Sequence, residues 1–207
     1  MKPSLLIAAA ICALAAPAVA QDPDKLPPQI GPDAIAPGVY AIDSKETLVR
    51  YTTIHMGYNE FWGTFPGATG TLAIDPKNLA AAKLDVKVPI AGVETTNREL
   101  DHELFSDEFF DGENHHNMQF VSTAVTRTGP RTAKVVGNLS LHGITKPVTL
   151  DVTFTGAGPN AFSKVPTLGF HAEGMVKRSD FGMAKFVPIV SDETKIDISV
   201  AFEKKAP

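Results

Sequence analysis

Imidazole and carboxylate side chains, which bind metals and transfer protons, gather in one stretch of the sequence. The segment from Glu94 to Glu113 contains eight acidic residues against one arginine, and His102 lies within it. His115 and His116 follow directly. These residue types can ligate zinc and other divalent metals, so the stretch is a candidate metal or catalytic site.

The spacing of these residues argues against such a site. The sequence has no H-E-x-x-H motif, which would place two ligands on one helix face. Adjacent histidines on a strand point to opposite faces, and acidic residues early in a helix stabilise its dipole. We therefore expect a solvated helix and loop here, and we expect that His102, His115 and His116 bind no structural metal.

A further candidate group, His55, ends a predicted strand whose inner face carries Tyr51. A histidine there can contact the polar part of a ligand, although a hydrogen bond within the protein is the commoner arrangement. No Ser-His-Asp order, G-x-S-x-G motif or phosphate-binding loop is present. We therefore expect a protein that is not an enzyme and requires no cofactor. The alternative is a small-molecule enzyme or metal protein that uses His55 or the His102/His115/His116 region.

Strands must position these groups, because apolar and polar residues alternate from residue 39 onward. A period of two is typical of strands with one buried and one solvated face. Four ranges alternate clearly and four more weakly: 84–90, 135–141, 148–154 and 196–202, then 39–55, 61–74, 117–128 and 167–178. One helix is expected over Asn97 to Phe105. Eight antiparallel strands in an open sheet would leave exposed edges, so we expect an all-β barrel or sandwich.

Alternation alone does not say whether the apolar face points into the protein or toward lipid, as it does in an outer-membrane barrel. The chain has one Trp and three Tyr, which are too few for two aromatic girdles. An acidic helix and loop also interrupts the strands. We therefore expect the apolar faces to point inward.

Composition and the first residues define the domain organisation. The 207 residues are 43% hydrophobic and 20% charged with a net charge of −4, which suits one globular domain and gives no electrostatic reason to bind nucleic acid. Lys2, a short apolar run and Ala18-Val19-Ala20 predict a signal peptide over residues 1–20, cleaved after Ala20. Five prolines in residues 21–37 predict an extended leader outside the core, and the folded domain is expected over 38–204.

A series of short motifs runs in order along this domain: His55-Met56-Gly57-Tyr58, Gly63-Thr64-Phe65, Val93 to Asn97, Asp101 to Leu104, Ser106, Phe109-Phe110-Asp111, Phe120-Val121-Ser122, Gly137 to Val148 and Arg178 to Gly182. Together they resemble the signatures of the YceI family of bacterial periplasmic proteins, also called polyisoprenoid-binding proteins. Two positions depart from the family pattern. Glu103 stands where histidine is frequent, with His102 one position earlier, and His116-Asn117 replaces a Tyr-Pro pair.

The resemblance implies a single antiparallel eight-stranded lipocalin-like barrel with one short helix. It further implies that the lumen binds a long-chain isoprenoid or related amphiphilic lipid, for transport or storage in the periplasm. Some relatives are linked to membrane cytochromes, which adds quinones to the implied ligands and a membrane cytochrome to the implied partners. A monomer and a homodimer are both compatible with it.

The residues expected to line one continuous apolar lumen and touch a lipid tail share the apolar phase of a strand or of a family signature: Tyr51, Phe120, Leu139, Leu141, Leu150, Val152, Phe154, Phe170, Ile196 and Ile198. The polar residues His55 and Arg178 fall in register with this face and are weaker candidates for contacting a ligand head group. Small residues on the same face are expected to leave room inside: Gly63, Gly137, Ala172 and Gly174.

Overall fold

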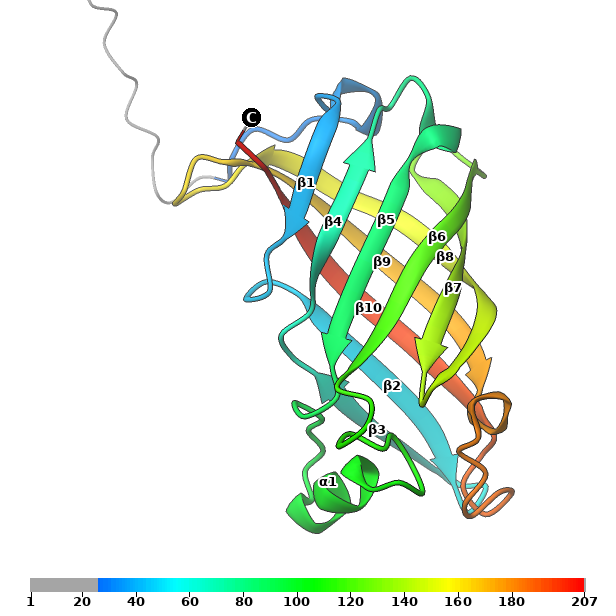
Figure 1. Cartoon of the computed structure of the whole chain (residues 1–207). Helices are drawn as coiled ribbons and strands as arrows, with labels where there is room; N and C mark the ends of the chain where they lie inside the picture. Colours follow the sequence, from blue (N-terminus) through cyan, green and yellow to red (C-terminus); the bar gives the residue numbers. More distant parts are fainter. Residues whose placement is uncertain (1–25, 207) are drawn as a thin grey trace, which may run out of the picture.

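The chain is an antiparallel meander closed on itself, with one helix at one end (Figure 1). The computed structural model describes residues 26–206, so the predicted signal peptide and the first residues of the leader lie outside the described part. The strands are β1 (Gly38–Ile42), β2 (Leu48–His55), β3 (Asn59–Phe65), β4 (Thr69–Ile74), β5 (Lys83–Pro89), β6 (Asn117–Arg127), β7 (Thr132–Leu141), β8 (Ile144–Pro159), β9 (Pro166–Lys177) and β10 (Glu193–Lys204).

These ten segments make eight barrel strands, because two of the eight are interrupted. The last residues of β10 pair with β1, and its first residues pair with β2. β1 and β2 are therefore two halves of one barrel strand, interrupted at residues 43–47. β3 pairs with β2 and β4 pairs with β1, so these two also form one strand, broken at 66–68. The pairing of β1 with β10 closes the ring, which confirms the predicted eight-stranded antiparallel barrel.

The connection between β7 and β8 shows how local sequence produces this meander. Leu141 pairs with Ile144, so the loop consists of His142 and Gly143 alone. Both residues have positive φ angles, 51° and 71°. A two-residue turn of this kind twists in the same sense as its strands, and glycine occupies the second position without steric cost.

The helix α1 (Arg98–Phe105) begins at Asn97, whose side-chain oxygen accepts hydrogen bonds from the backbone N–H groups of Glu99 and Leu100. Leu104 is buried in the main core. The segment that leads into the helix is fixed at the free edge of β3, where Thr64 and Glu94 exchange backbone hydrogen bonds of 2.8 and 2.9 Å. None of the helices in residues 26–206 has the length and apolar character needed to cross a membrane.

The leader prediction was wrong for the residues nearest the barrel. A 3-10 turn, η1 (Pro32–Ala34), is followed by Ile35, which is only 5% exposed and packs with Tyr40 in the second core cluster. The backbone of Ile30 also donates a hydrogen bond of 2.9 Å to the carbonyl of Ala157. The proline content predicted an extended chain outside the core, whereas Ile35 lies over the end of the barrel, where burial of its apolar side chain is favourable.

Candidate functional site

The barrel encloses one continuous cavity with a volume of about 810 Å³. Its lining residues run from η1 and the β6–β7 turn, here called the leader end, to α1 and the β2–β3 turn, here called the helix end. Figure 1 shows these elements at opposite ends of the barrel. Its wall contains every residue that was expected to face the lumen: Tyr51, His55, Phe120, Leu139, Leu141, Leu150, Val152, Phe154, Phe170, Arg178, Ile196 and Ile198. The structure thus brings these residues together, and their contact with a ligand stays a prediction.

Exposure differences along the wall show that the lumen is hollow. Leu139 and Leu150 are buried, as core residues are. Val152, Ile196 and Ile198 also point inward but are only half-buried. A half-buried side chain inside a closed barrel faces empty space, because its other sides pack against the wall. An apolar cavity of this size is at the upper end of the range for small-molecule sites.

The glycines do not create this space, contrary to expectation. A Cβ atom at Gly137 would lie 2.3 Å from the ring of Phe120, and one at Gly63 would lie 2.7 Å from the ring of Tyr51. These rings therefore fill the volume that the glycines leave, which lets two large side chains lie flat along the wall. The expectation was correct in placing the glycines inside but wrong about what occupies their space.

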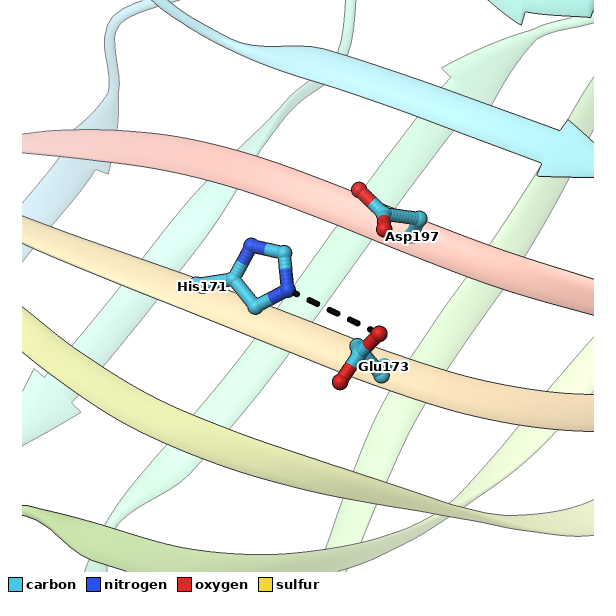
Figure 2. Close-up of side chains that lie close together, drawn as sticks. All are labelled: His171, Glu173 and Asp197. Carbon is cyan, nitrogen blue, oxygen red and sulfur yellow. Dashed lines mark ion pairs between the residues drawn. The ribbon is translucent and has the colours of Figure 1, made fainter.

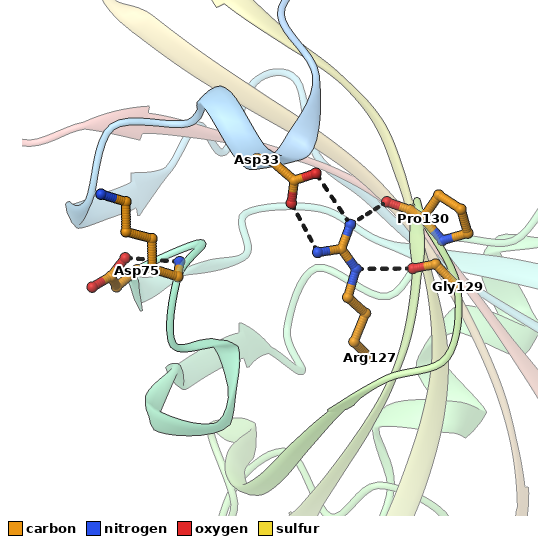
Figure 3. Close-up of polar contacts among 6 residues, drawn as sticks. Asp33, Asp75, Arg127, Gly129 and Pro130 are labelled. Atoms are coloured by element: carbon orange, nitrogen blue, oxygen red, sulfur yellow. Dashed lines mark hydrogen bonds and ion pairs between the residues drawn. The ribbon is translucent and has the colours of Figure 1, made fainter.

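An ion pair ties the leader to the barrel at the leader end (Figure 3). The Nη1 atom of Arg127 lies 2.8 Å from a carboxylate oxygen of Asp33, and the same guanidinium donates to the carbonyls of Gly129 and Pro130. The hydrogen bond and the charge of Arg127 hold the pKa of Asp33 below its ordinary value. This contact positions η1 over the end of the lumen.

Polar and aromatic side chains surround the lumen at the helix end. Lys185 forms ion pairs with Glu103, at 3.1 Å, and with Glu108. Its Nζ atom also lies 5.0 Å from the ring centre of Phe186, which faces the ring of Phe109 at 6.3 Å. The hydrogen bonds to Glu108 and Glu103 raise the pKa of Lys185. Glu103, one of the departures from the family pattern, therefore binds a lysine of the facing loop in this protein.

Arg178 lies in the wall of the cavity, but its side chain is hydrogen-bonded to backbone carbonyl groups. Its guanidinium donates to three carbonyl oxygens, those of Met183, Val190 and Ser191, at 2.7, 2.9 and 2.9 Å. Burial lowers the pKa of Arg178. These bonds make it an anchor for the loop that precedes β10, and they leave His55 as the stronger of the two candidates for a head-group contact.

Tyr51 contributes a hydroxyl group to the wall of the cavity. Its ring lies 5.8 Å from that of Phe65, and burial, with the nearby carboxylate of Asp101, raises the pKa of Tyr51 far above its ordinary value. The phenol therefore stays neutral at any physiological pH. A neutral hydroxyl in an apolar wall suits a hydrophobic ligand with few polar atoms.

The histidines in and after the acidic segment do not share a common partner. His102 is exposed on α1, the Nε2 atom of His115 lies 3.6 Å from a carboxylate oxygen of Asp111, and the Nδ1 atom of His116 lies 3.0 Å from the carbonyl oxygen of Gly112. The structure does not bring these three imidazoles into one ligand set within its described residues. That they bind no structural metal stays a prediction.

A different trio comes together on the outside of the barrel (Figure 2). Ligand atoms of His171 and Glu173 on β9 and of Asp197 on β10 lie within 4.8 Å of one another. The Nζ atom of Lys195 lies 2.5 Å from Glu173, and Arg50 lies 3.1 Å from Asp197. These cations neutralise both carboxylates, so a surface ion-pair network accounts for the cluster.

Sequence reasoning missed the residues of the helix end, above all Phe109, Phe186 and Val190, which also line the cavity. They lie in loops, where strand alternation gives no signal. The available signal was composition, since Phe186 belongs to the uncharged run Phe186-Val187-Pro188-Ile189-Val190, which lies between two predicted strands.

Comparison with known proteins agrees with this geometry. The model of the YceI-like domain matches residues 40–202. Protein YceI of Salmonella arizonae is 35% identical over 163 residues, which cover 78% of this chain and 84% of that protein. Among solved structures, Burkholderia cenocepacia BcnA has a TM-score of 0.70 at 22% identity, covering 77% of this chain and 98% of that one. A polyisoprenoid-binding domain from Saccharophagus degradans, implicated in plant cell wall breakdown, has a TM-score of 0.59 at 13% identity, with 80% and 98% covered. An eight-stranded barrel around an apolar lumen, together with the match along nearly all of its strands, establishes that this chain belongs to the YceI family.

Proposed function

We propose that this protein binds a long-chain isoprenoid or related amphiphilic lipid in the barrel lumen and serves as a carrier or store for it. The observation that carries the proposal is the continuous apolar cavity of about 810 Å³. A polyprenyl chain in such a lumen would gain about 0.8 kcal/mol for each buried CH₂ group, less the cost of ordering the chain. The Saccharophagus degradans domain is described as polyisoprenoid-binding, which supports the ligand class.

The finer parts of the proposal concern place and partners. The predicted signal peptide, with cleavage after Ala20, supports action in the periplasm. Quinones share the isoprenoid tail and are therefore included among the ligands, and a membrane cytochrome is the partner that a quinone carrier would serve. The wall offers apolar contact and few polar groups, which supports binding rather than catalysis.

Native mass spectrometry of the purified protein tests the proposal, combined with organic extraction and analysis of the material that accompanies it. We expect a stoichiometric apolar ligand, and we expect its removal to lower the melting temperature because a ligand stabilises only the folded state. Protein that carries no lipid and takes up no undecaprenol from detergent micelles would contradict the proposal. Bound metal or turnover of a small molecule would favour the enzyme or metal alternative.

A further inference from the structure

Six exposed apolar residues gather at the helix end of the barrel, here called the mouth patch: Ile54, Met56, Tyr58, Phe186, Val187 and Ile189. They come from the β2–β3 turn and from the loop before β10, which Figure 1 shows together at this end. Tyr58 is 81% exposed. A large contiguous apolar patch on a protein surface marks a candidate interaction site.

Backbone hydrogen bonds hold the two halves of the mouth patch together. The N–H of Met56 donates to the carbonyl of Ile189 at 2.6 Å, and the N–H of Ser191 donates to the carbonyl of Ile54 at 2.8 Å. The patch is therefore one surface built on the end of β2. It is also continuous with the lumen, because Phe186 both lines the cavity and contributes to the exposed surface.

Backbone conformation indicates that this exposure is maintained at a cost. Met56 and Phe186 have φ angles of 54° and 63°. A bulky side chain in this left-handed region is strained, and such strain is concentrated at functional sites. Glycine or asparagine would relieve it, so the large apolar side chains at these two positions point to a role in contact.

Charge distinguishes among the occupants that this surface could bind. Residues 54–59 and 186–191 contain no lysine, arginine, aspartate or glutamate, and the adjacent Lys185 is neutralised by Glu103 and Glu108. The acidic α1 segment lies at the same end. The charges that flank the patch are acidic, since exposed Glu60 pairs with Ile54 and α1 lies at the same end. An uncharged patch with acidic surroundings fits a surface that is apolar inside and has no net negative charge. A bilayer with zwitterionic head groups has both properties, whereas an anionic membrane would repel the acidic segment.

We propose that the mouth patch docks on a zwitterionic lipid bilayer, so that the lumen opens into the membrane past Phe186. This inference rests on the proposed lipid-binding function and adds where the ligand enters. Tyr58 and the nearby Trp62 are of the two types enriched at membrane–water interfaces, and Trp62 is 51% exposed on β3.

Flotation with phosphatidylcholine vesicles tests the docking. The double variant Tyr58→Ser/Ile189→Ser removes two patch residues that do not line the cavity. The matched control Val39→Ser/Phe162→Ser removes two exposed apolar residues from the leader end, where Phe162 is 95% exposed. We expect the patch variant to lower the vesicle partition coefficient by about tenfold or more, since each side chain contributes apolar burial, and the control to float like the unaltered protein. Trp62, the chain's single tryptophan, should shift its fluorescence to shorter wavelength only where docking occurs.

Uptake of undecaprenol separates this inference from the function on which it rests. We expect both double variants to bind undecaprenol from detergent micelles like the unaltered protein, and only the patch variant to extract it slowly from vesicles. Normal uptake from micelles with no flotation, or equal loss of flotation in both variants, would overturn the docking while leaving lipid binding intact. Absence of uptake in every form would instead overturn the proposed function. A patch that holds two copies of the chain together in solution, without vesicle binding, would also contradict docking.

Discussion

At the scale of single residues, Arg178 shows how a buried charge can stabilise a loop. It is 7% exposed, and its guanidinium donates to three carbonyl oxygens of the loop before β10. A buried cation without such acceptors would be strongly unfavourable. Arg178 therefore adds three side-chain hydrogen bonds to the backbone bonds that hold the loop before β10, which carries half of the mouth patch.

Arg178→Lys should lower the free energy of unfolding by on the order of 2–4 kcal/mol, because lysine cannot reach three separate carbonyls with a single ammonium group. The exposed Arg98 on α1 provides the control, and Arg98→Lys should change stability by less than about 0.5 kcal/mol. Urea unfolding monitored by circular dichroism measures both values. Equal stability of the two variants would show that the three hydrogen bonds contribute nothing.

Asp192 should make the stability of the same loop depend on pH. The backbone N–H of Ser179 donates to it at 2.8 Å and the Ser179 hydroxyl at 2.7 Å, and these bonds hold the pKa of Asp192 below its ordinary value of 3.8. Because the pKa is lower in the folded state, this stabilisation is complete above the unfolded pKa and is lost as the pH falls through the folded pKa.

Asp192→Asn should therefore cost stability near neutral pH and much less at about pH 3, as measured by urea unfolding at both values. Ser179→Ala, which keeps the backbone donor, should show a smaller loss with the same pH trend. A stability difference that is the same at both pH values would contradict the argument.

At the scale of elements, alternation predicted all eight strands, and the helix expected over Asn97 to Phe105 was found as α1. The structure divides the expected strand 39–55 into β1 and β2, and the expected strand 61–74 into β3 and β4. Alternation does not reveal such a short interruption when the same apolar face continues on both sides of it. The apolar positions of the alternation also identified correctly which strand residues face the cavity. What it could not predict is how side chains fill the lumen, since the ring of Phe120 over Gly137 depends on the pairing of two strands.

The sequence also did not predict which residues pack at the two ends of the barrel. Ile35 covers the leader end although prolines surround it, and Phe186 stands at the helix end in a loop. Both positions are set by which segments meet at a barrel rim. Composition identifies such residues as apolar but does not give their partners.

Ile35→Ala tests whether the leader is part of the folded domain. Removal of a buried isoleucine side chain should lower the free energy of unfolding by about 2–4 kcal/mol. Ile30, five residues earlier and 39% exposed, is the matched control, and Ile30→Ala should cost less than about 1 kcal/mol. Similar small losses for both variants in urea unfolding would mean that the leader does not contribute to the core.

Gly137→Ala tests the contact that lets Phe120 lie along the wall. The new methyl group would meet the ring at 2.3 Å and the carbonyl of Val121 at 2.7 Å, so a loss of about 1–3 kcal/mol is expected. Gly31→Ala, which meets nothing within 4 Å, is the control and should be neutral. Addition of Phe120→Leu to Gly137→Ala should recover part of the loss. No recovery would mean that the carbonyl, rather than the ring, sets the cost.

At the scale of the whole molecule, the lumen can be blocked without altering the wall glycines. Ala172 lies in the cavity wall between Val152 and Ile198, with which it is in register. Ala172→Phe should fill part of the lumen and reduce the lipid recovered by extraction at least severalfold, at an overpacking cost of about 1–3 kcal/mol. Ala124→Phe adds the same ring at an exposed position outside the wall and should leave the lipid content unchanged. A folded Ala172→Phe variant that retains as much lipid as the unaltered protein would place the ligand outside the lumen.

The closure of the barrel by β10 also orders events in time. β10 is hydrogen-bonded to β9 along one edge and to β1 and β2 along the other, so it is the strand that closes the barrel. Until residues 193–204 have been synthesised and paired, the other strands can form only an open, curved sheet. Such a sheet has two unpaired edges, and its apolar face is exposed to water. Contacts between the first and last strands also form slowly, because they close the longest loop in the chain. The barrel can therefore enclose a ligand only after the last strand has paired, and until then its inner apolar face is exposed and prone to aggregation.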